Sequence, residues 1–246
     1  MKKSPGNERA ETLDTLFAGR LKILQKKDGY RFSIDALLLA RFVQPRRTDR
    51  VIDLGTGCGV IPLILLFRRE AQKVIGVEIQ PALAEIARRN AALNRFVNRF
   101  PIWEKDLKTL RPKSGQGNFD LVLTNPPYRK VGSGRVNPEG EKAVARHELN
   151  ATLTDVLRTA SFLLKPRGRL CLIYPASRAP ELIQAIGRFH LEPKRLQFVH
   201  SHHQDKARLL LVEARKEGRA QAQVLPPFFL YESTGESTPE AQALFR

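Results

Sequence analysis

The amino-acid sequence predicts an α/β fold, a doubly wound, seven-stranded and mostly parallel sheet with an antiparallel closing strand. The first observation that predicts this fold is that short apolar runs alternate with longer amphipathic segments from residue 51 to residue 189. This alternation is typical of a parallel sheet with helices on both faces. The second is a pair of apolar runs near the C-terminus, joined by the polar segment HSHHQDKA, as in two antiparallel strands.

The predicted elements follow one another regularly along the chain. Seven apolar runs are predicted as strands: Val51–Leu54, Lys73–Glu78, Phe100–Trp103, Phe119–Thr124, Arg169–Tyr174, Lys194–Val199 and Arg208–Ala214. Apolar residues at helical spacing predict the helices between them: 60–69, 81–94, 149–164 and 180–189. The third of these is expected to stop near Pro166 and Gly168. A further helix is expected to begin at Ile34, with Ser33 as its cap and Asp35 favourable at its positive end.

The charge of the chain points to the kind of partner. Of the 246 residues, 42 are Lys or Arg and 25 are Asp or Glu, which gives a net charge of +17. Such an excess favours a polyanionic partner, with nucleic acid first and an anionic membrane surface second. A general basic bias of the source proteome would explain the charge without any such partner.

Cysteine usage and hydropathy favour a cytoplasmic protein. Cys58 and Cys171 lack the CxxC spacing of a zinc site and do not suggest a disulfide framework. The basic N-terminus has no apolar signal-peptide region, and no apolar run approaches the ~20 residues of a membrane span. His200, His202 and His203 lack the carboxylate or thiol spacing that would complete a metal site. We therefore expect no membrane association and no metal.

Glycines and acids follow the first three predicted strands, where ligands of such sheets bind. The segment DLGTGCG places Gly55, Gly57 and Gly59 directly after the first strand. The spacing is not the GxGxxG of a dinucleotide fingerprint, and a glycine turn alone often serves only helix packing. Glu78 ends the second strand and could accept bonds from ribose hydroxyls, while Asp106 could bond an adenine amino group. Together these strand ends could bind the ribose and the adenine of an adenosine.

The fourth strand ends in Asn-Pro-Pro-Tyr, which suits the methylation of a planar nitrogen. The side-chain carbonyl of Asn125 and the backbone carbonyl of Pro126 could accept the two hydrogens of an exocyclic amine and free its lone pair. Pro127 continues the rigid backbone, because each proline fixes its φ angle and lacks an N–H donor. Tyr128 offers a ring on which an extruded base could stack. The alternative is that this segment only terminates a strand, since Asn-Pro is a common turn former.

These motifs, in this order, resemble the class I S-adenosylmethionine-dependent methyltransferases, which share a Rossmann-like fold. The resemblance implies S-adenosyl-L-methionine as cofactor, with the glycine turn at its methionine part, the second-strand acid on the ribose and the third acid on the adenine. The catalytic residues would be Asn125, Pro126, Pro127 and Tyr128. The cofactor-binding residues would be Phe32, Ser33, Asp35, Asp53, Gly55, Gly57, Gly59, Glu78, Ile79, Asp106 and Asn125.

Longer segments resemble one branch of that class, the bacterial tRNA (valine) adenine-N6 methyltransferases, which modify the adenine beside the anticodon. They include GYRFSIDALLLA, NPPYRK, ARHEL and LEPKRLQFVH, and they extend over nearly the whole chain. The resemblance implies an RNA partner, tRNA in particular, and no obligate protein partner. The substrate-binding residues would be Tyr128, Arg129, Lys130, Arg146 and His147. A departure is Cys58, where a small serine or alanine is more usual.

Other acceptors remain open, because a glutamine amide is also a planar nitrogen. The methyltransferases of release-factor glutamine carry the same NPPY, although a helical domain precedes their glycine turn, and rRNA methylation is a further alternative. A catalytically silent RNA-binding protein on the same fold is the alternative from another class.

The expected organisation is an N-terminal extension with a cofactor-covering helix (1–45), a methyltransferase core (46–220) and a C-terminal tail (221–246).

Overall fold

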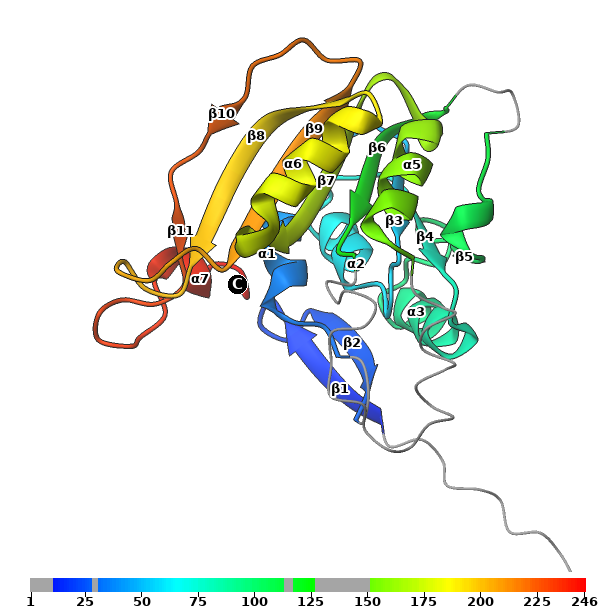
Figure 1. Cartoon of the computed structure of the whole chain (residues 1–246). Coiled ribbons are helices and arrows are strands. Elements are labelled where there is room, and N and C mark those ends of the chain that lie inside the picture. The colour runs from blue at the N-terminus through cyan, green and yellow to red at the C-terminus, as the bar shows by residue number, and fades with distance from the viewer. Residues whose placement is uncertain (1–10, 28–30, 113–116, 127–150) are drawn as a thin grey trace, which may run out of the picture.

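A large mixed sheet forms the centre of the protein, whose computed structural model describes residues 11–27, 31–112, 117–126 and 151–246 (Figure 1). Within these residues the sheet has nine strands in the order β10-β8-β9-β7-β6-β3-β4-β5, with β11 also paired to β8. The strands are β3 (Val51–Leu54), β4 (Val74–Glu78), β5 (Ile102–Glu104), β6 (Phe119–Thr124), β7 (Leu164–Pro175), β8 (Leu191–His200), β9 (Leu209–Lys216), β10 (Gln223–Val224) and β11 (Phe228–Phe229).

The strand directions confirm the predicted sheet. β3 lies parallel to β4 and β6, β4 parallel to β5, and β6 parallel to β7. β9 is antiparallel to both of its neighbours, β7 and β8, so the closing strand is inserted between them. β10 and β11 add two-residue pairs to the outer edge of β8, which the sequence did not predict.

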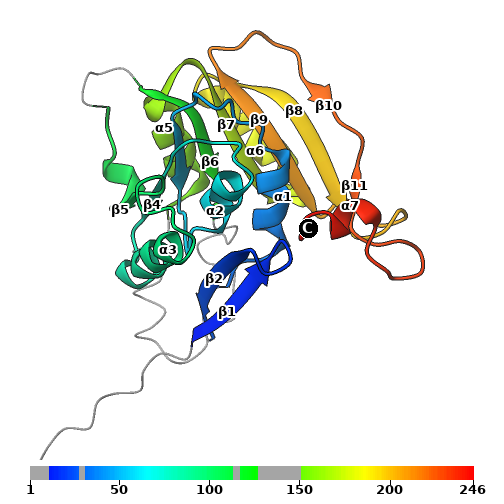
Figure 2. The same cartoon turned by 180° about the vertical axis from the view of Figure 1, so that it is seen from behind.

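Helices cover both faces of the sheet, as expected for a doubly wound fold (Figure 2). One face carries α1 (Ile34–Phe42), α2 (Val60–Phe67) and α3 (Pro81–Leu93), and the other carries α5 (Leu153–Leu163) and α6 (Ala179–Arg188). Short elements complete the chain: η1 (Leu107–Thr109), η2 (Ala176–Arg178) and α7 (Pro239–Gln242). None of the described helices has the length and apolar character required to span a membrane.

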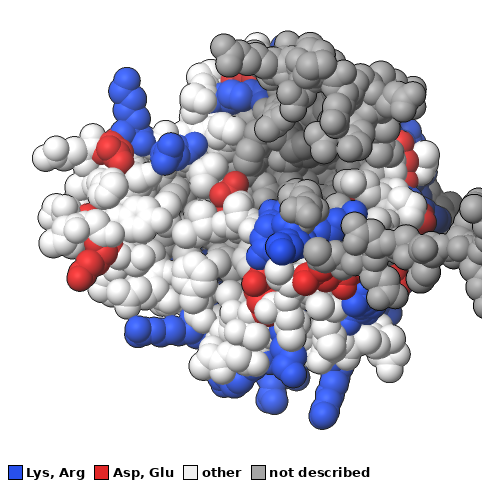
Figure 3. All heavy atoms as spheres, turned by 90° about the horizontal axis from the view of Figure 1, so that it is seen from below, with Lys and Arg blue, Asp and Glu red and all other residues white. Residues whose placement is uncertain are grey.

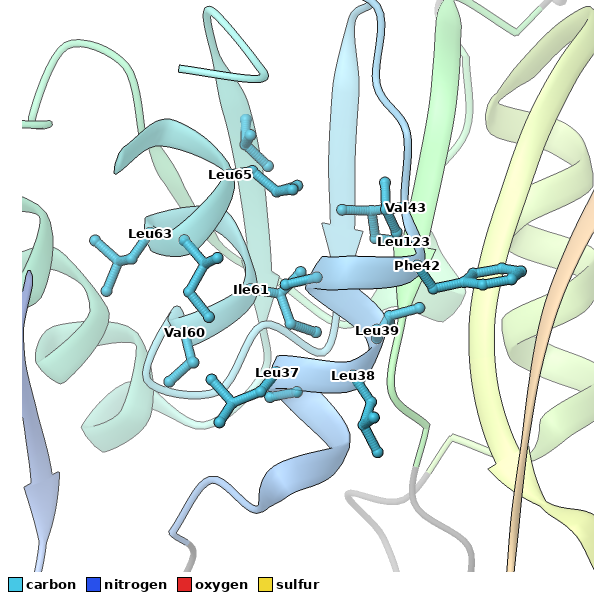
Figure 4. Close-up of a cluster of buried hydrophobic side chains, with 14 of the residues drawn as sticks. Leu37, Leu38, Leu39, Phe42, Val43, Val60, Ile61, Leu63, Leu65 and Leu123 are labelled. Carbon is cyan, nitrogen blue, oxygen red and sulfur yellow. The ribbon is translucent and has the colours of Figure 1, made fainter. Parts of the chain in front are cut away.

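Each face of the sheet has its own apolar core, because successive side chains of a strand point to opposite faces. In β6, Leu121 and Leu123 join the core under α1 and α2, whereas Val122 joins the core under α5 and α6. Figure 4 shows the first of these cores, where leucines of α1 interlock with Val60 and Ile61 of α2 beside Leu123. The α1 helix is therefore part of the folded body.

A hairpin precedes α1, in a part of the chain for which the sequence predicted no strand. β1 (Glu11–Leu16) and β2 (Leu21–Lys26) pair in antiparallel register, from Glu11 opposite Lys26 to Leu16 opposite Leu21. Leu21 and Ile23 are completely buried, whereas Lys22 between them is exposed. This alternation is the period-two pattern of a strand with one buried face. The hairpin therefore packs its apolar side on the core.

The third predicted helix ends within one residue of its expected end, but the strand after it begins earlier than predicted. α5 ends at Leu163, and Pro166 and Gly168 both lie inside β7. The chain turns directly from helix to strand, since Leu164 has an extended backbone and pairs with Phe119 of β6. The proline therefore stands at the irregular start of a strand, where the register of the β6–β7 pair shifts.

Candidate active site

The register of four parallel strands brings the predicted site residues to one edge of the sheet. β3 lies between β4 and β6, and Leu54 is paired with Val77 on one side and Thr124 on the other. The residues that follow these three are Gly55, Glu78 and Asn125. The chain order also reverses here, since β4 and β5 extend the sheet on one side of β3 and β6 begins the other. Ligands of open α/β sheets bind at such a switch point.

The glycine turn after β3 has a backbone conformation that favours glycine at each of its three positions. Gly55, Gly57 and Gly59 have φ angles of 75°, 59° and 88°, in the left-handed region that other residues rarely adopt. A Cβ atom on Gly59 would also come within 2.5 Å of the ring of Phe100. A Cβ atom on Gly55 would meet no atom within 4 Å, so that position faces open space. The turn therefore packs on its inner side and is accessible at Gly55.

Glu78 connects β4 to the glycine turn. Its Oε2 accepts a hydrogen bond of 2.9 Å from the backbone nitrogen of Gly57, and its Oε1 accepts one of 2.9 Å from that of Gln80. Burial raises the pKa of this carboxyl, while these backbone N–H groups oppose the shift. Each carboxylate oxygen has a second lone pair, so Glu78 can still accept bonds from neighbouring hydroxyls. Ile79, the next residue, is half-buried.

Asp53 is a buried acid beneath the turn. Its Oδ2 accepts a bond of 2.7 Å from the hydroxyl of Thr56, but its Oδ1 has no hydrogen-bond partner among the described residues. Burial raises the pKa of Asp53 to about 7, and the charge of Glu78 adds to the shift. Buried polar atoms are usually paired, so Oδ1 is a vacant acceptor that suits a cationic or N–H-bearing ligand.

Asp106 lies beyond β5, two residues after Glu104, which pairs with Glu78. Its Oδ1 caps the short helix η1 by accepting a 2.9 Å bond from the backbone nitrogen of Lys108. Its Oδ2 lies 3.4 Å from the ammonium of the same lysine, and the side chain remains part-exposed. The carboxylate is thus fixed by local bonds at the same edge as Glu78.

Asn125 and Pro126 end β6 beside the glycine turn. The hydroxyl of Thr124 donates a 2.9 Å bond to the backbone oxygen of Leu54, which ties the last residues of β6 and β3 together. Asn125 is half-buried and Pro126 is buried. The remaining predicted catalytic and substrate residues lie outside the described part of the chain: Pro127, Tyr128, Arg129, Lys130, Arg146 and His147.

The start of α1 is held by the hairpin. Ser33 caps the helix as predicted, since its hydroxyl accepts from the backbone nitrogen of Asp35 in the first turn. Phe32 packs half-buried against the core, and its backbone nitrogen donates a 2.8 Å bond to the side chain of Gln25 in β2. Gln25 is buried and bonds in turn to Asp14 of β1. The hairpin therefore fixes where the predicted cofactor-covering segment begins.

Asn90 of α3 is a site-supporting residue that the sequence analysis missed. Its amide donates to the backbone oxygens of Cys58 in the glycine turn, at 2.9 Å, and of Leu24 in β2, at 3.0 Å. Its Oδ1 accepts a 2.7 Å bond from the Leu24 nitrogen. Asn94, one turn later, makes the equivalent pair of bonds with Lys22. A polar residue on the same helical face as Ile86 was the available signal.

The charged side chains around this edge are distributed over the surface. Figure 3 shows the molecule from the side at which β6 ends, with lysines and arginines in several separate groups among acids. Among the described residues, no cluster of three or more His, Cys, Asp or Glu side chains could hold a metal ion.

The two cysteines, Cys58 and Cys171, are buried and do not form a disulfide with each other. Burial raises the pKa of Cys58 to about 12.

Residues 31–189 match the family model described as the methyltransferase small domain. A protein from Porphyromonas gingivalis strain W83, named tRNA1(Val) (adenine(37)-N6)-methyltransferase, is 35% identical over 193 residues, which cover 77% of this chain and 75% of that protein. A protein of the same name from Aliivibrio salmonicida is 27% identical, over 74% and 76% of the two chains. Among solved structures, a predicted O-methyltransferase from Agrobacterium tumefaciens superimposes with a TM-score of 0.68 at 29% identity, covering 85% of this chain and 94% of that one.

Proposed function

The chain belongs to the methyltransferase small-domain family, and from that premise we propose that it transfers a methyl group to the exocyclic N6 of an adenine in tRNA. It is an S-adenosyl-L-methionine-dependent enzyme, as its family implies. The target we propose is adenine 37, beside the anticodon of a valine tRNA. The names of the two relatives support this choice, and so does the net charge of +17.

The residues at the carboxyl edge of the sheet fit the cofactor. The vacant Oδ1 of Asp53 suits the cationic methionine end, and the free lone pairs of Glu78 suit the two ribose hydroxyls. Asp106 would bond the adenine amino group, beside Ile79. Phe32, Ser33 and Asp35 would close over the bound molecule. The remaining cofactor residues that we propose are Gly55, Gly57, Gly59 and Asn125.

The end of β6 suits chemistry at an amine. The cofactor supplies a methyl group bonded to a positively charged sulfur. Asn125 and the backbone oxygen of Pro126 would accept the two N–H groups of the adenine and so direct the nitrogen lone pair away from the ring. The two acceptors would hold the amine in place during transfer of that methyl group from sulfur to nitrogen, and the proton that the methylated nitrogen loses would pass to water. Tyr128 would stack on the base and Pro127 would keep the backbone rigid.

A hydroxyl acceptor is less suited to this arrangement, although the Agrobacterium relative is named as an O-methyltransferase. A hydroxyl has one hydrogen, whereas the two acceptors proposed at Asn125 and Pro126 match the two hydrogens of an amine. The pairing of Leu54 with Thr124, which sets Asn125 beside the glycine turn, is the observation that carries the proposal.

We further propose that four residues contact the RNA: Arg129, Lys130, Arg146 and His147. The compartment that we propose is the cytoplasm. The three-part organisation that we propose has boundaries near residues 45 and 220.

Incubation with deuterated-methyl cofactor tests the proposal. Separate reactions would contain total tRNA, rRNA and release factor, followed by nucleoside or peptide mass spectrometry. We expect label in N6-methyladenosine from tRNA, and none with Asn125→Ala. Asn98→Ala, an exposed asparagine after α3, is the matched control and should label normally. Label in release-factor glutamine, in rRNA or in a methylated hydroxyl would overturn the proposed acceptor.

A further inference from the structure

We propose that the end of β8 and the turn after it, together with the end of β11 and the residues that follow, form a stacking surface for an unpaired nucleotide of the RNA substrate. This histidine–aromatic surface consists of His200, His202, His203, Phe229 and Tyr231. It rests on the proposed function for the identity of the RNA. It adds a second contact, separate from the residues that hold the target adenine.

Ring contacts organise the histidine–aromatic surface. His203 stacks on Phe229 with 3.8 Å between ring centroids and an interplanar angle of 21°. His202 lies 5.6 Å from Tyr231 and His200 lies 5.4 Å from Phe229, both in tilted arrangements. Unpaired RNA bases stack on tyrosine, phenylalanine and histidine rings alike, and without strong sequence preference.

Hydrogen bonds fix the turn that carries these rings. The side chain of Asp205 accepts from the backbone nitrogen of His202 at 3.2 Å and lies 3.0 Å from its Nδ1. The Tyr231 nitrogen donates a 2.9 Å bond to the backbone oxygen of Ser201, which joins the C-terminal segment to the turn. Rings held in this way lose little conformational entropy when a base stacks on them.

The rings remain accessible at the surface. His203 is exposed, and so is 37% of Tyr231, so a base can reach both rings. Lys206 and Arg208 are exposed in the same turn and can contact phosphates. Metal binding does not explain the histidines, since the described residues contain no cluster that could hold an ion.

The histidine–aromatic surface lies at the same edge of the sheet as the proposed active site. β8 and β6 run in the same direction, so the turn after His200 and the end of β6 at Thr124 lie at the same edge of the sheet, the lower edge in Figure 1. Three strand spacings separate β8 from β6, or about 14 Å. A stacked RNA strand covers that distance in about four nucleotides. A base near the target can therefore reach these rings.

Steady-state kinetics with tRNA test the proposal in the full chain. The variants His203→Ala and Tyr231→Ala each remove a ring, whereas His203→Phe and Tyr231→Phe keep one. Phe162→Ala is the matched control, because Phe162 is an exposed aromatic of α5 at the opposite edge of the sheet. Thermal unfolding shows that each variant is folded, and filter binding of tRNA without cofactor measures RNA affinity independently of methyl transfer.

We expect the combined His203→Ala and Tyr231→Ala variant to raise the KM for tRNA and the Kd by about tenfold or more, with kcat unchanged. The two phenylalanine variants and Phe162→Ala should behave as the wild type. Unchanged KM and Kd in the combined variant would overturn the proposal, as would an equal loss in the control. A wild type that binds tRNA without methylating it would overturn only the proposed function, because the binding series would still decide this one.

Discussion

The carboxylate of Glu78 accepts a hydrogen bond from the backbone of Gly57, across the boundary between β4 and the glycine turn. The acid proposed to hold the cofactor ribose is therefore also a support of the turn proposed to hold its methionine end. A change at Glu78 should therefore affect both halves of the proposed cofactor site.

Glu78→Gln should reduce the affinity for the cofactor more than it reduces the rate of methyl transfer. The amide keeps an acceptor for one of the two backbone N–H groups but loses the charge, so we expect the cofactor Kd to rise by about tenfold to a hundredfold. Isothermal titration gives the Kd, and kcat at saturating cofactor should recover most of the wild-type value. A kcat loss that saturation does not restore would contradict this division of roles.

Asn125→Ala should have the opposite effect. Removing one of the two proposed acceptors should lower kcat by about a hundredfold or more, while the cofactor Kd changes by less than about threefold. Single-turnover methyl transfer and titration measure the two quantities. Asn98→Ala serves again as the surface control. Asn125 is also among the proposed cofactor residues, but its main role is at the acceptor, so an equal loss of cofactor affinity and turnover in Asn125→Ala would contradict this assignment.

Asp53→Asn should flatten the pH dependence of stability. The folded pKa of Asp53 is raised from 3.8 to about 7 by burial, so its contribution to the free energy of unfolding is fully present below about pH 4 and is lost as the pH rises through 7. Between pH 5 and 8 we expect the wild type to lose about 1–3 kcal/mol relative to Asp53→Asn. Urea unfolding of cofactor-free protein measures this difference, and parallel curves for the two proteins would contradict it.

Asn90→Ala should detach the hairpin from the core. The change leaves backbone groups of Leu24 and Cys58 without their buried partner, so we expect a loss of about 2–4 kcal/mol in the free energy of unfolding. Asn94→Ala is the matched control, because its bonds to Lys22 are solvent-exposed and water can replace them at a cost of under about 1 kcal/mol. Hydrogen exchange of β2 should increase in the first variant only. Equal losses in the two variants would show that burial of Asn90 is unimportant.

RNA affinity should fall steeply with salt. If lysines and arginines of the protein contact four or more phosphates, a plot of log K against log salt concentration should have a slope of about −3 or steeper. Filter binding of tRNA between low and physiological salt measures this slope. A nearly flat plot would mean that the net charge of +17 does not serve RNA binding.

The sequence was sufficient for the parallel core because its signals are local. Val51–Leu54 and Phe119–Thr124 have the predicted bounds, since each is a short apolar run with turn residues at its end. The same local rules gave Ser33 as the cap of α1. The parallel direction of these strands followed from the alternation of strands and helices, and the rule for strand ends then placed the glycine turn and Glu78 at one edge of the sheet. The order of the strands came from the structure.

Long-range pairing was beyond those rules. The β1–β2 hairpin is stable because Leu21 and Ile23 meet the core, a contact that depends on residues far along the chain. The role of Asn90 could not be predicted, because its partner, the backbone of Leu24, lies in β2, which is far away in the sequence. The same holds for the pairing of His203 with Phe229, which joins a turn to a segment that follows it by more than twenty residues.

Asn90 of α3 and Asn94, the residue that follows the helix, have an evolutionary consequence. Asn90 and Asn94 present to β2 the donors and acceptors that a neighbouring strand would present, and so they match the backbone of Leu24 and Lys22 rather than any side chain. These bonds consequently place no requirement on the side chains at residues 22 and 24. An N-x-x-x-N signature at the end of α3 should be inherited together with the hairpin and disappear from lineages that have lost it.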